Sequence, residues 1–462
     1  MWPTSARSTS PTIPNSTDPT PVAGSISSRI LRLGLPILIG QLGQIVVGFA
    51  DTAMVGRYST EALASASFVN NLFNVAIFAS LGFAYGLTPI VGALYSRGRS
   101  RRIGALMRSA VMVNLLFALL LTAIMLAVYF NLHRLGQPPE LMPLIRPYFI
   151  IVLAGMIPLT LFNVFAQWSY AIKNTSMPMW ILLSCNLINI IGNYALIYGH
   201  FGAPELGLTG AGISTLFVRI LAATAIAIVY FRKESNREYR IGFINGRILS
   251  EKSLMRKLIQ TSWPVALQMT FETSAFSVCA VFAGWMGKVP LAAYQIILVI
   301  GQLGFCIYYS IGMAIAVLVA NESGMKSLKG CRRVAFDGYG VMLFFAAIAM
   351  TVFIGFSRQL MGIFTTDEAV LLTAQSLIIP LAIYQLGDAT QITFANALRG
   401  TAHVMPMLWI AFVSYVVVGL SSSWVIAFPC GMGIYGIVLS FSISLFLAAA
   451  LFLRQFLKIT SK

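Results

Sequence analysis

Hydrophobic residues run along the chain in long blocks that short polar segments separate. A helix needs roughly 20 mainly apolar residues to cross a hydrocarbon core about 30 Å thick. Blocks of this length, bounded by charged residues or by Gly and Pro, cover 33–55, 66–95, 107–130, 145–171, 179–198, 210–231, 261–286, 291–320, 334–355, 369–398, 405–428 and 433–456. The pattern therefore predicts an all-α polytopic membrane protein with twelve transmembrane helices.

Two segments lack this pattern. Residues 1–28 are rich in Ser, Thr and Pro and lack the basic start and apolar core of a signal peptide, so we expect a disordered tail. Residues 232–258 are the most charged stretch and divide the spans into two sets of six. We expect an N-lobe at 29–231, a cytoplasmic linker at 232–258 and a C-lobe at 259–462.

The two halves resemble each other at an offset of 228 residues. The matches, in chain order, are Pro36 with Pro264, Leu63-Ala64 with Leu291-Ala292, Met177-Pro178-Met179 with Met405-Pro406-Met407, and, after a two-residue shift, Gly207 and Gly210 with Gly433 and Gly436. Six spans per half start both halves on the same side of the membrane, so the repeats are parallel. Many transporters use this plan and rock two lobes about a cleft. The alternative is a duplicated bundle without a transport role.

Composition and charge agree with a membrane protein. Charged residues make up 10% of the chain, against about 25% in soluble domains. A net charge of +17 is typical of nucleic-acid binding, but no binding motif accompanies it. Counted along the predicted spans, 25 of the 31 Lys and Arg, including Arg399, fall on the side of the tail, five fall opposite, and Arg219 lies within a span. Cytoplasmic loops collect Lys and Arg, so both termini are predicted to be cytoplasmic, and no nucleic-acid partner is expected.

Three acidic residues lie well inside the predicted spans: Asp51, Glu272 and Asp388. An ionised carboxylate at the bilayer centre costs about 2.5–3.5 kcal/mol, and binding of a proton or of Na⁺ relieves that cost. Glu272 and Asp388 lie near the middle of their spans, so we predict that they couple transport to cation uptake. Asp51 lies nearer the outer end; we predict the same coupling role for it, although at that depth it can also cap or pair locally. Structural hydrogen bonding is the alternative for all three.

Several uncharged polar residues also fall inside spans. Asn189 and Asn193 are four residues apart and therefore share a helix face, and Gln44 stands two turns before Asp51. We consider them as supporting residues of the acidic site, although such side chains often only join neighbouring helices. Arg219 is expected to pair with an acid, to face the cleft or to extend to the membrane surface.

Other kinds of chemistry have little support. The five Cys form no CxxC or Cys/His spacing, so neither a metal site nor a disulfide framework is expected. All three His fall at loops or span ends, and HExxH and GxSxG are absent, so we predict neither an enzyme nor a cofactor beyond the coupling ion. A channel would need a filter sequence or an oligomeric pore. A lipid-linked oligosaccharide flippase stays an alternative, but its cavity should be basic to hold pyrophosphate.

The sequence resembles the multidrug and toxic compound extrusion (MATE) family over about 33–456. LPILIGQLGQIVVGFADTAMVGRYSTEALASAS resembles the family's first span, NLINIIGNYALIYGHFGAPELGLTGAGIST its fifth and sixth, and WPVALQMTFET and YQLGDATQITFANALRGT its NorM branch. The NorM acids of spans seven and ten fall on Glu272 and Asp388. The acid of span one falls on Asp51, the amides of span five fall on Asn189 and Asn193, and Cys279 stands at the repeat counterpart of Asp51.

The resemblance implies a V-shaped fold of two six-helix lobes. It also implies export of cationic, amphipathic compounds in exchange for inward Na⁺ or H⁺. We therefore expect a monomeric multidrug antiporter, surrounded by lipids, in the bacterial inner membrane. Its partners would be small organic cations, and cation uptake at Glu272 and Asp388 would repack the second lobe and weaken drug binding.

Overall fold

The computed structural model describes residues 25–135, 138–245, 252–365 and 367–461, and within these ranges the chain forms helices and no strands. The first half contains α1 (Ile26–Tyr58), α2 (Thr60–Tyr85), α3 (Leu87–Tyr95), α4 (Ser100–Phe130), α5 (Met142–Ala154), α6 (Met156–Ala171), α7 (Ser176–Tyr198) and α8 (Gly207–Arg232). After α9 (Arg237–Asn245), the second half contains α10 (Lys252–Trp285), α11 (Lys288–Gly324), α12 (Leu328–Gly355), α13 (Ser357–Gly362), α14 (Glu368–Ser376), α15 (Ile378–Gly400), α16 (Met405–Ala411), a π-helical segment (Phe412–Leu420), α17 (Ser421–Ala427) and α18 (Gly433–Thr460). Single 3₁₀ turns occupy Leu132–Leu135, Pro139–Leu141, His200–Gly202 and Glu234–Asn236.

The helices account for the predicted spans. In the described part of the chain, eleven helical runs are long and apolar enough to cross a membrane, and α14 with α15, bent by 45°, makes a twelfth. The second span consists of α2 and α3, and the fourth span consists of α5 and α6, which meet at Gly155. The prediction of an all-α protein with twelve spans is confirmed.

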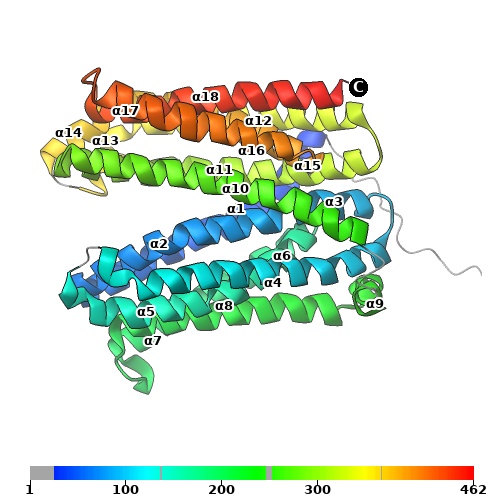
Figure 1. The fold of residues 1–462 in the computed structure, drawn as a ribbon, viewed down its shortest axis with the longest axis horizontal. Coiled ribbons are helices and arrows are strands. Elements are labelled where there is room, and N and C mark those ends of the chain that lie inside the picture. The colour runs from blue at the N-terminus through cyan, green and yellow to red at the C-terminus, as the bar shows by residue number, and fades with distance from the viewer. Residues whose placement is uncertain (1–24, 136–137, 246–251, 366, 462) are drawn as a thin grey trace, which may run out of the picture.

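The helices form two lobes, α1–α8 and α10–α18, which lie side by side in Figure 1. The start of α1 and the end of α18 lie at one end of the molecule, here called the terminal end; the turn between α1 and α2 lies at the far end. Near the terminal end α1 and α3 pack against α11, and α2 packs against α10. The lobes separate towards the far end (Figure 1), which confirms the expected V shape.

Small residues allow the lobes to touch. A Cβ atom on Gly82 of α2 would lie 2.9 Å from the carbonyl oxygen of Val265 and from the Cα of Ala266 on α10, so the two backbones meet there without a side chain between them. One cluster of buried residues extends from Ile30 in the first lobe to Phe394 in the second. Burial of this apolar surface holds the terminal end of the V closed.

A short helix, α9, lies within the expected linker and crosses the terminal end of α4, where Figure 1 shows it end-on. The backbone of Gly242 on α9 lies against that of Arg101 on α4. Arg101 Nε also donates a hydrogen bond of 2.7 Å to Glu238 Oε2. The linker is therefore partly helical and packs on the first lobe.

The expected domain boundaries fall close to helix ends. Residues 1–24 of the expected tail and 246–251 of the expected linker lie outside the described residues. α1 begins at Ile26 and α10 at Lys252, before the lobe boundaries expected at 29 and 259. Polar residues precede each apolar run in the same helix, which is why hydrophobicity places the boundaries later.

Candidate transport site

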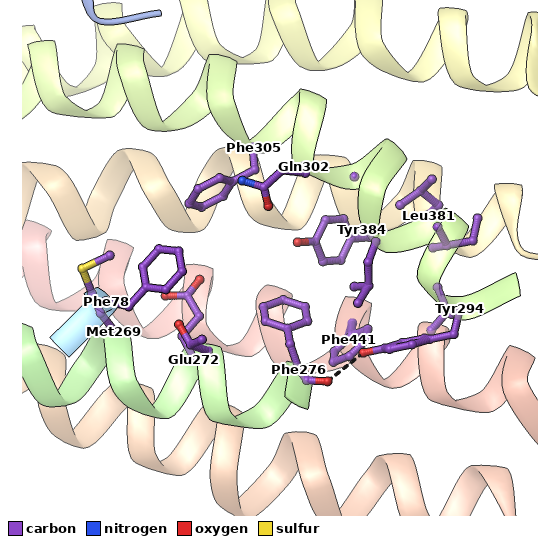
Figure 2. A pocket seen from close by; sticks show the side chains of 15 residues that line it. Phe78, Met269, Glu272, Phe276, Tyr294, Gln302, Phe305, Leu381, Tyr384 and Phe441 are labelled. Atoms are coloured by element: carbon purple, nitrogen blue, oxygen red, sulfur yellow. Dashed lines mark hydrogen bonds between the residues drawn. The ribbon is translucent and has the colours of Figure 1, made fainter. Parts of the chain in front are cut away.

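Two neighbouring cavities lie along the inner faces of the lobes. The C-lobe cavity, of about 210 Å³, lies between α10, α11, α15 and α18 (Figure 2). The central cavity, of about 310 Å³, lies between the lobes and is lined mainly by α1, α2, α6 and α11. Phe78, Met269, Gln302 and Phe305 line both, so a ligand can contact the two cavities together.

The carboxylate of Glu272 lies among the aromatic side chains that line the C-lobe cavity. Glu272 lies mid-way along α10, and Figure 2 shows its carboxylate beside the Phe78 ring, with Phe276 and Tyr384 on the same cavity. Tyr294 at the other end of this cavity donates its hydroxyl to the carbonyl oxygen of Phe276, at 3.0 Å. Aromatic faces attract cations, so these rings and the carboxylate suit a ligand that is both apolar and positively charged.

Asp388 is 1% exposed and does not line this cavity. It follows Tyr384 by one turn of α15, which places it in the same lobe as Glu272. Within the described residues, Asp388 Oδ2, the Tyr308 hydroxyl and both polar atoms of the Gln385 side chain have no hydrogen-bond partner. Buried polar atoms are rarely left without one, so this group has the capacity to hold a small cation or water.

Asp51 lies in the other lobe and accepts a hydrogen bond from Asn193, one of the two predicted amides. Asn193 of α7 donates a hydrogen bond to Asp51 Oδ1, and a second, of 3.3 Å, to Asn189 Oδ1. Asn189 in turn donates to the hydroxyls of Ser214 and Thr215 on α8, each at 3.4 Å. The structure therefore joins Asp51, Asn189 and Asn193 in one network between α1, α7 and α8.

Gln44 does not belong to this network. It lies two turns earlier on α1 and lines the central cavity together with Gln41. The structure therefore separates the predicted supporting residues into two places.

The two lobes differ chemically at equivalent positions. Cys279, the repeat counterpart of Asp51, donates its thiol to the Ser423 hydroxyl at 3.5 Å. Cys279–Ser423 joins α10 to α17, and Asp51–Asn193 joins α1 to α7. Both lobes therefore have a side-chain contact between these helices, and the contact of the first lobe carries a charge.

Arg399 lies at the terminal end, on the side of the tail as expected, but inside the protein and not in a loop. It belongs to α15, which continues to Gly400, and is 3% exposed. Its guanidinium carbon lies 5.0 Å from the centroid of the Tyr85 ring of α2. Its Nη1 donates a hydrogen bond of 3.1 Å to Asn396 Oδ1. The Tyr85 ring and the Asn396 amide partly replace water around the cation, and the contact joins the two lobes at the closed terminal end.

The MatE family model matches residues 36–195 and 264–425, which cover most of both lobes. The chain belongs to the MATE family. It is 31% identical over 433 residues to a probable multidrug resistance protein NorM of Bradyrhizobium diazoefficiens, covering 92% of each chain. It is 27% identical to the multidrug resistance protein NorM of Aliivibrio fischeri, over 88% of this chain and 89% of that one.

The solved structures agree on the fold. An outward-facing multidrug resistance MATE family transporter of the MOP superfamily superposes with a TM-score of 0.87, at 17% identity, over 95% of this chain and 96% of that one. The chain is thus a NorM-like MATE transporter, and MATE proteins are transporters rather than enzymes.

The contact between Arg399 and Tyr85 gives a test of the closed end in this MATE protein. A desolvated cation–π contact contributes about 2 kcal/mol, or roughly thirtyfold in an equilibrium. We expect Tyr85→Leu to reduce the far-end-open population by about that factor. Spin labels at Arg57 and Arg358, two exposed positions at the far end, would report a shorter distance. Tyr85→Phe keeps the ring and should match the wild type; equal distances in all three proteins would contradict this role.

Sequence reasoning missed most of the cavity wall. Tyr384 precedes Asp388 by four residues and so shares its helix face, a signal that was available in the sequence. Phe78, Gln302 and Phe305 come from helices far apart along the chain, and only the packing of the lobes brings them together.

Proposed function

We propose that the chain is a secondary active multidrug exporter that moves organic cationic and amphipathic compounds outward in exchange for inward Na⁺ or H⁺. The observation that carries this proposal is the Glu272 carboxylate in an aromatic cavity, with Asp388 buried one turn after Tyr384, which lines the same cavity. Membership of the MATE family and two relatives named as multidrug resistance proteins support export of drugs.

The linings of the two cavities favour a cationic substrate. Among the described residues that line them, Glu272 is the charged one, and the rest are aromatic, aliphatic, amide or small side chains. A pyrophosphate-linked lipid would need basic groups at the same place. The lining therefore supports an organic cation over the alternative of an oligosaccharide flippase.

The arrangement of the two lobes indicates which conformation of the proposed cycle the structure represents. Lys and Arg gather at the terminal end, which we place at the cytoplasm because of the positive-inside rule. The lobes touch at that end and part at the other, so this conformation faces outward (Figure 1). Glu272 and Asp388 then take up Na⁺ or H⁺ from outside.

Uptake of the coupling ion changes the charge of the site that binds the drug. The drug and the coupling ion are both positive, so an ion at Glu272 or Asp388 removes the attraction that holds the drug in the C-lobe cavity. Release outward follows, and the inward-facing state loses the ion to the cytoplasm and accepts the next drug. The coupling is reciprocal: each ligand weakens the binding of the other by the same factor.

The proposed setting is the bacterial inner membrane, with both termini cytoplasmic and the chain acting as a monomer among lipids. The twelve apolar spans support a multi-pass protein. The organisms of the relatives support a bacterial membrane.

Purified protein in liposomes would test the proposal. Sodium and pH gradients are imposed separately, and efflux of a fluorescent organic cation is followed. We expect at least one gradient to drive saturable efflux of the cation and not of an anionic dye of similar shape. Equal movement of both dyes, or ohmic flux without saturation, would contradict an antiporter of cations.

The shared wall of the two cavities predicts a substitution with a moderate effect. Phe305→Ala should weaken binding of a cationic dye by roughly 2- to 30-fold, because a cation–π contact contributes about 0.5–2 kcal/mol. Phe344→Ala on α12 is the matched control, since that ring is 63% exposed and lies away from both cavities. Fluorescence titration would measure both affinities; equal losses would remove Phe305 from the binding site.

A further inference from the structure

A groove between α16 and α18 lies on the surface of the second lobe, apart from both transport cavities. The two helices pack against each other, and α16 begins and α18 ends at the terminal end of the molecule. The groove has a volume of about 500 Å³. The side chains that give it its character are Met405, Trp409 and Ile410 of α16 and Leu451, Arg454 and Lys458 of α18.

The groove is basic towards the membrane surface and apolar towards the membrane centre. Arg454 and Lys458 are four residues apart and therefore share one face of α18, in its last two turns. Leu451 lies one turn deeper, and Trp409 and Ile410 lie deeper along α16, which runs away from the terminal end. A positive charge above an apolar channel is complementary to a phospholipid, whose phosphate lies above its acyl chains.

The two basic side chains are not used within the protein. Among the described residues, neither Arg454 nor Lys458 forms a hydrogen bond or an ion pair, and no acidic side chain lines the groove. The end of α18 is bound instead by Arg332 of α12, which donates 2.9 Å to Thr460 Oγ1 and 3.2 Å to the carbonyl oxygen of Leu457. Arg454 and Lys458 therefore keep their donors for an anion from outside the chain.

The repeat shows that one of these charges is an addition to the second lobe. In the alignment of the two last spans, Lys458 corresponds to Arg232 and Arg454 corresponds to Ile228. Ile228 is 51% exposed, so the first lobe presents an apolar side chain to lipid at this depth. Cytoplasmic helix ends commonly carry one basic residue, which accounts for Lys458 and Arg232. It does not account for Arg454.

The depth of Arg454 favours a partner in the membrane over water. Arg454 lies six residues before Thr460, the last residue of α18, or about 9 Å along the helix axis. The Cα–Cβ bond of a helical residue tilts towards the N-terminus of the helix, and in α18 this direction points to the membrane centre. An Arg in a membrane span is costly without a partner. A phosphate can accept two parallel hydrogen bonds from its guanidinium.

We propose that this groove binds an anionic phospholipid, with the lipid phosphate on Arg454 and Lys458 and an acyl chain along Ile410 and Leu451. Basic pockets between membrane helices are suited to such headgroups. Trp409 is 62% exposed and takes the interfacial place that Trp favours in membranes. The site lies outside both transport cavities, so it does not depend on the proposed function.

Quenching of Trp409 fluorescence by brominated lipids tests this site. The protein is placed in phosphatidylcholine vesicles with a rising fraction of brominated phosphatidylglycerol or brominated phosphatidylcholine at constant ionic strength. The signal of Trp409 is the difference between the wild type and Trp409→Phe. We expect phosphatidylglycerol to reach half of its full quenching at a roughly 25-fold smaller fraction, since each basic side chain contributes about fivefold. Equal quenching by the two lipids would overturn the proposal.

Neutral variants assign the preference to the groove. Arg454→Gln should reduce the preference for phosphatidylglycerol about fivefold, and Arg454→Gln/Lys458→Gln should abolish it. Arg232→Gln is the matched control, because it removes one positive charge from the equivalent helix end of the first lobe; it should keep the wild-type preference. Arg454 and Lys458 are exposed, so we expect folded proteins, which melting temperatures check. A folded double variant with the wild-type preference would contradict the site.

Two further measurements separate this site from other sources of the signal. Trp180 near the start of α7 is 64% exposed in the first lobe, and its signal, obtained with Trp180→Phe, should show a much smaller preference for phosphatidylglycerol. The same preference at Trp180 and Trp409 would mean that the whole basic surface attracts the lipid. Inorganic phosphate should reduce quenching at Trp409 no more than chloride of equal ionic strength; displacement by phosphate alone would indicate a site for the free ion. Either result would overturn the proposal.

Discussion

Glu272→Gln and Asp388→Asn are each expected to reduce gradient-driven efflux of organic cations strongly while the protein stays folded. Both substitutions keep the size of the side chain and remove the negative charge that the coupling ion neutralises. The ion then has no differential affinity for the two conformations, and a gradient cannot drive their exchange. Coupling free energies of 1–3 kcal/mol correspond to about 5- to 150-fold, and we expect losses at the upper end because both acids lie in one lobe.

The measurement is dye efflux from proteoliposomes under an imposed sodium or pH gradient. Glu368→Gln is a matched control, because Glu368 is an exposed acid in the first turn of α14. It should transport as the wild type does. Intact gradient-driven efflux in both Glu272→Gln and Asp388→Asn would remove these acids from the coupling site.

Gly82→Ala is expected to shift the protein away from the far-end-open conformation. The added Cβ would lie 2.9 Å from the backbone of α10, and the neighbours are backbone atoms that cannot rotate away. Overpacking of this kind costs about 1–3 kcal/mol, so we expect the closed terminal end to open and efflux to fall about 5- to 150-fold. Spin-label distances between Arg57 and Arg358 would shorten accordingly.

Gly340→Ala provides the comparison on a helix surface. A Cβ at Gly340 of α12 has open space around it. Ala is favoured over Gly inside helices by roughly 1 kcal/mol, so this variant should melt at or above the wild-type temperature with unchanged efflux. If Gly82→Ala behaved in the same way, the close approach of α2 and α10 would have no role in holding the lobes.

The fold was largely predictable because a bilayer requires long apolar runs. The twelve runs and the division near residue 232 correspond to helices of the structure. Hydrophobicity does not show where a span breaks, since that depends on neighbours: Gly155 interrupts the fourth span where Arg219 packs, and α14 bends from α15 by 45°. The periodicity of hydrophobic residues likewise does not predict the π-helical segment in the eleventh span.

The candidate site was predictable only where a residue is costly in the membrane. Glu272, Asp388 and Asp51 are unusual in apolar spans, and the structure places the first two in one lobe and the third in a network with Asn189 and Asn193. The burial of Arg399 was not predictable, because the Tyr85 ring over which it lies belongs to the other lobe. Aromatic residues are common throughout the chain, so nothing local marks Phe78 or Phe305 as cavity wall.

The central claim is exchange of a drug for a coupling cation, and counterflow in one vesicle population tests it most directly. Movement of a labelled organic cation and of a sodium tracer or protons is recorded together, and the imposed cation gradient is then reversed. We predict that the two fluxes run in opposite directions at a fixed ratio and that reversing the gradient reverses both. Drug movement that keeps its direction and rate after both the sodium and the pH gradients are reversed would contradict the account.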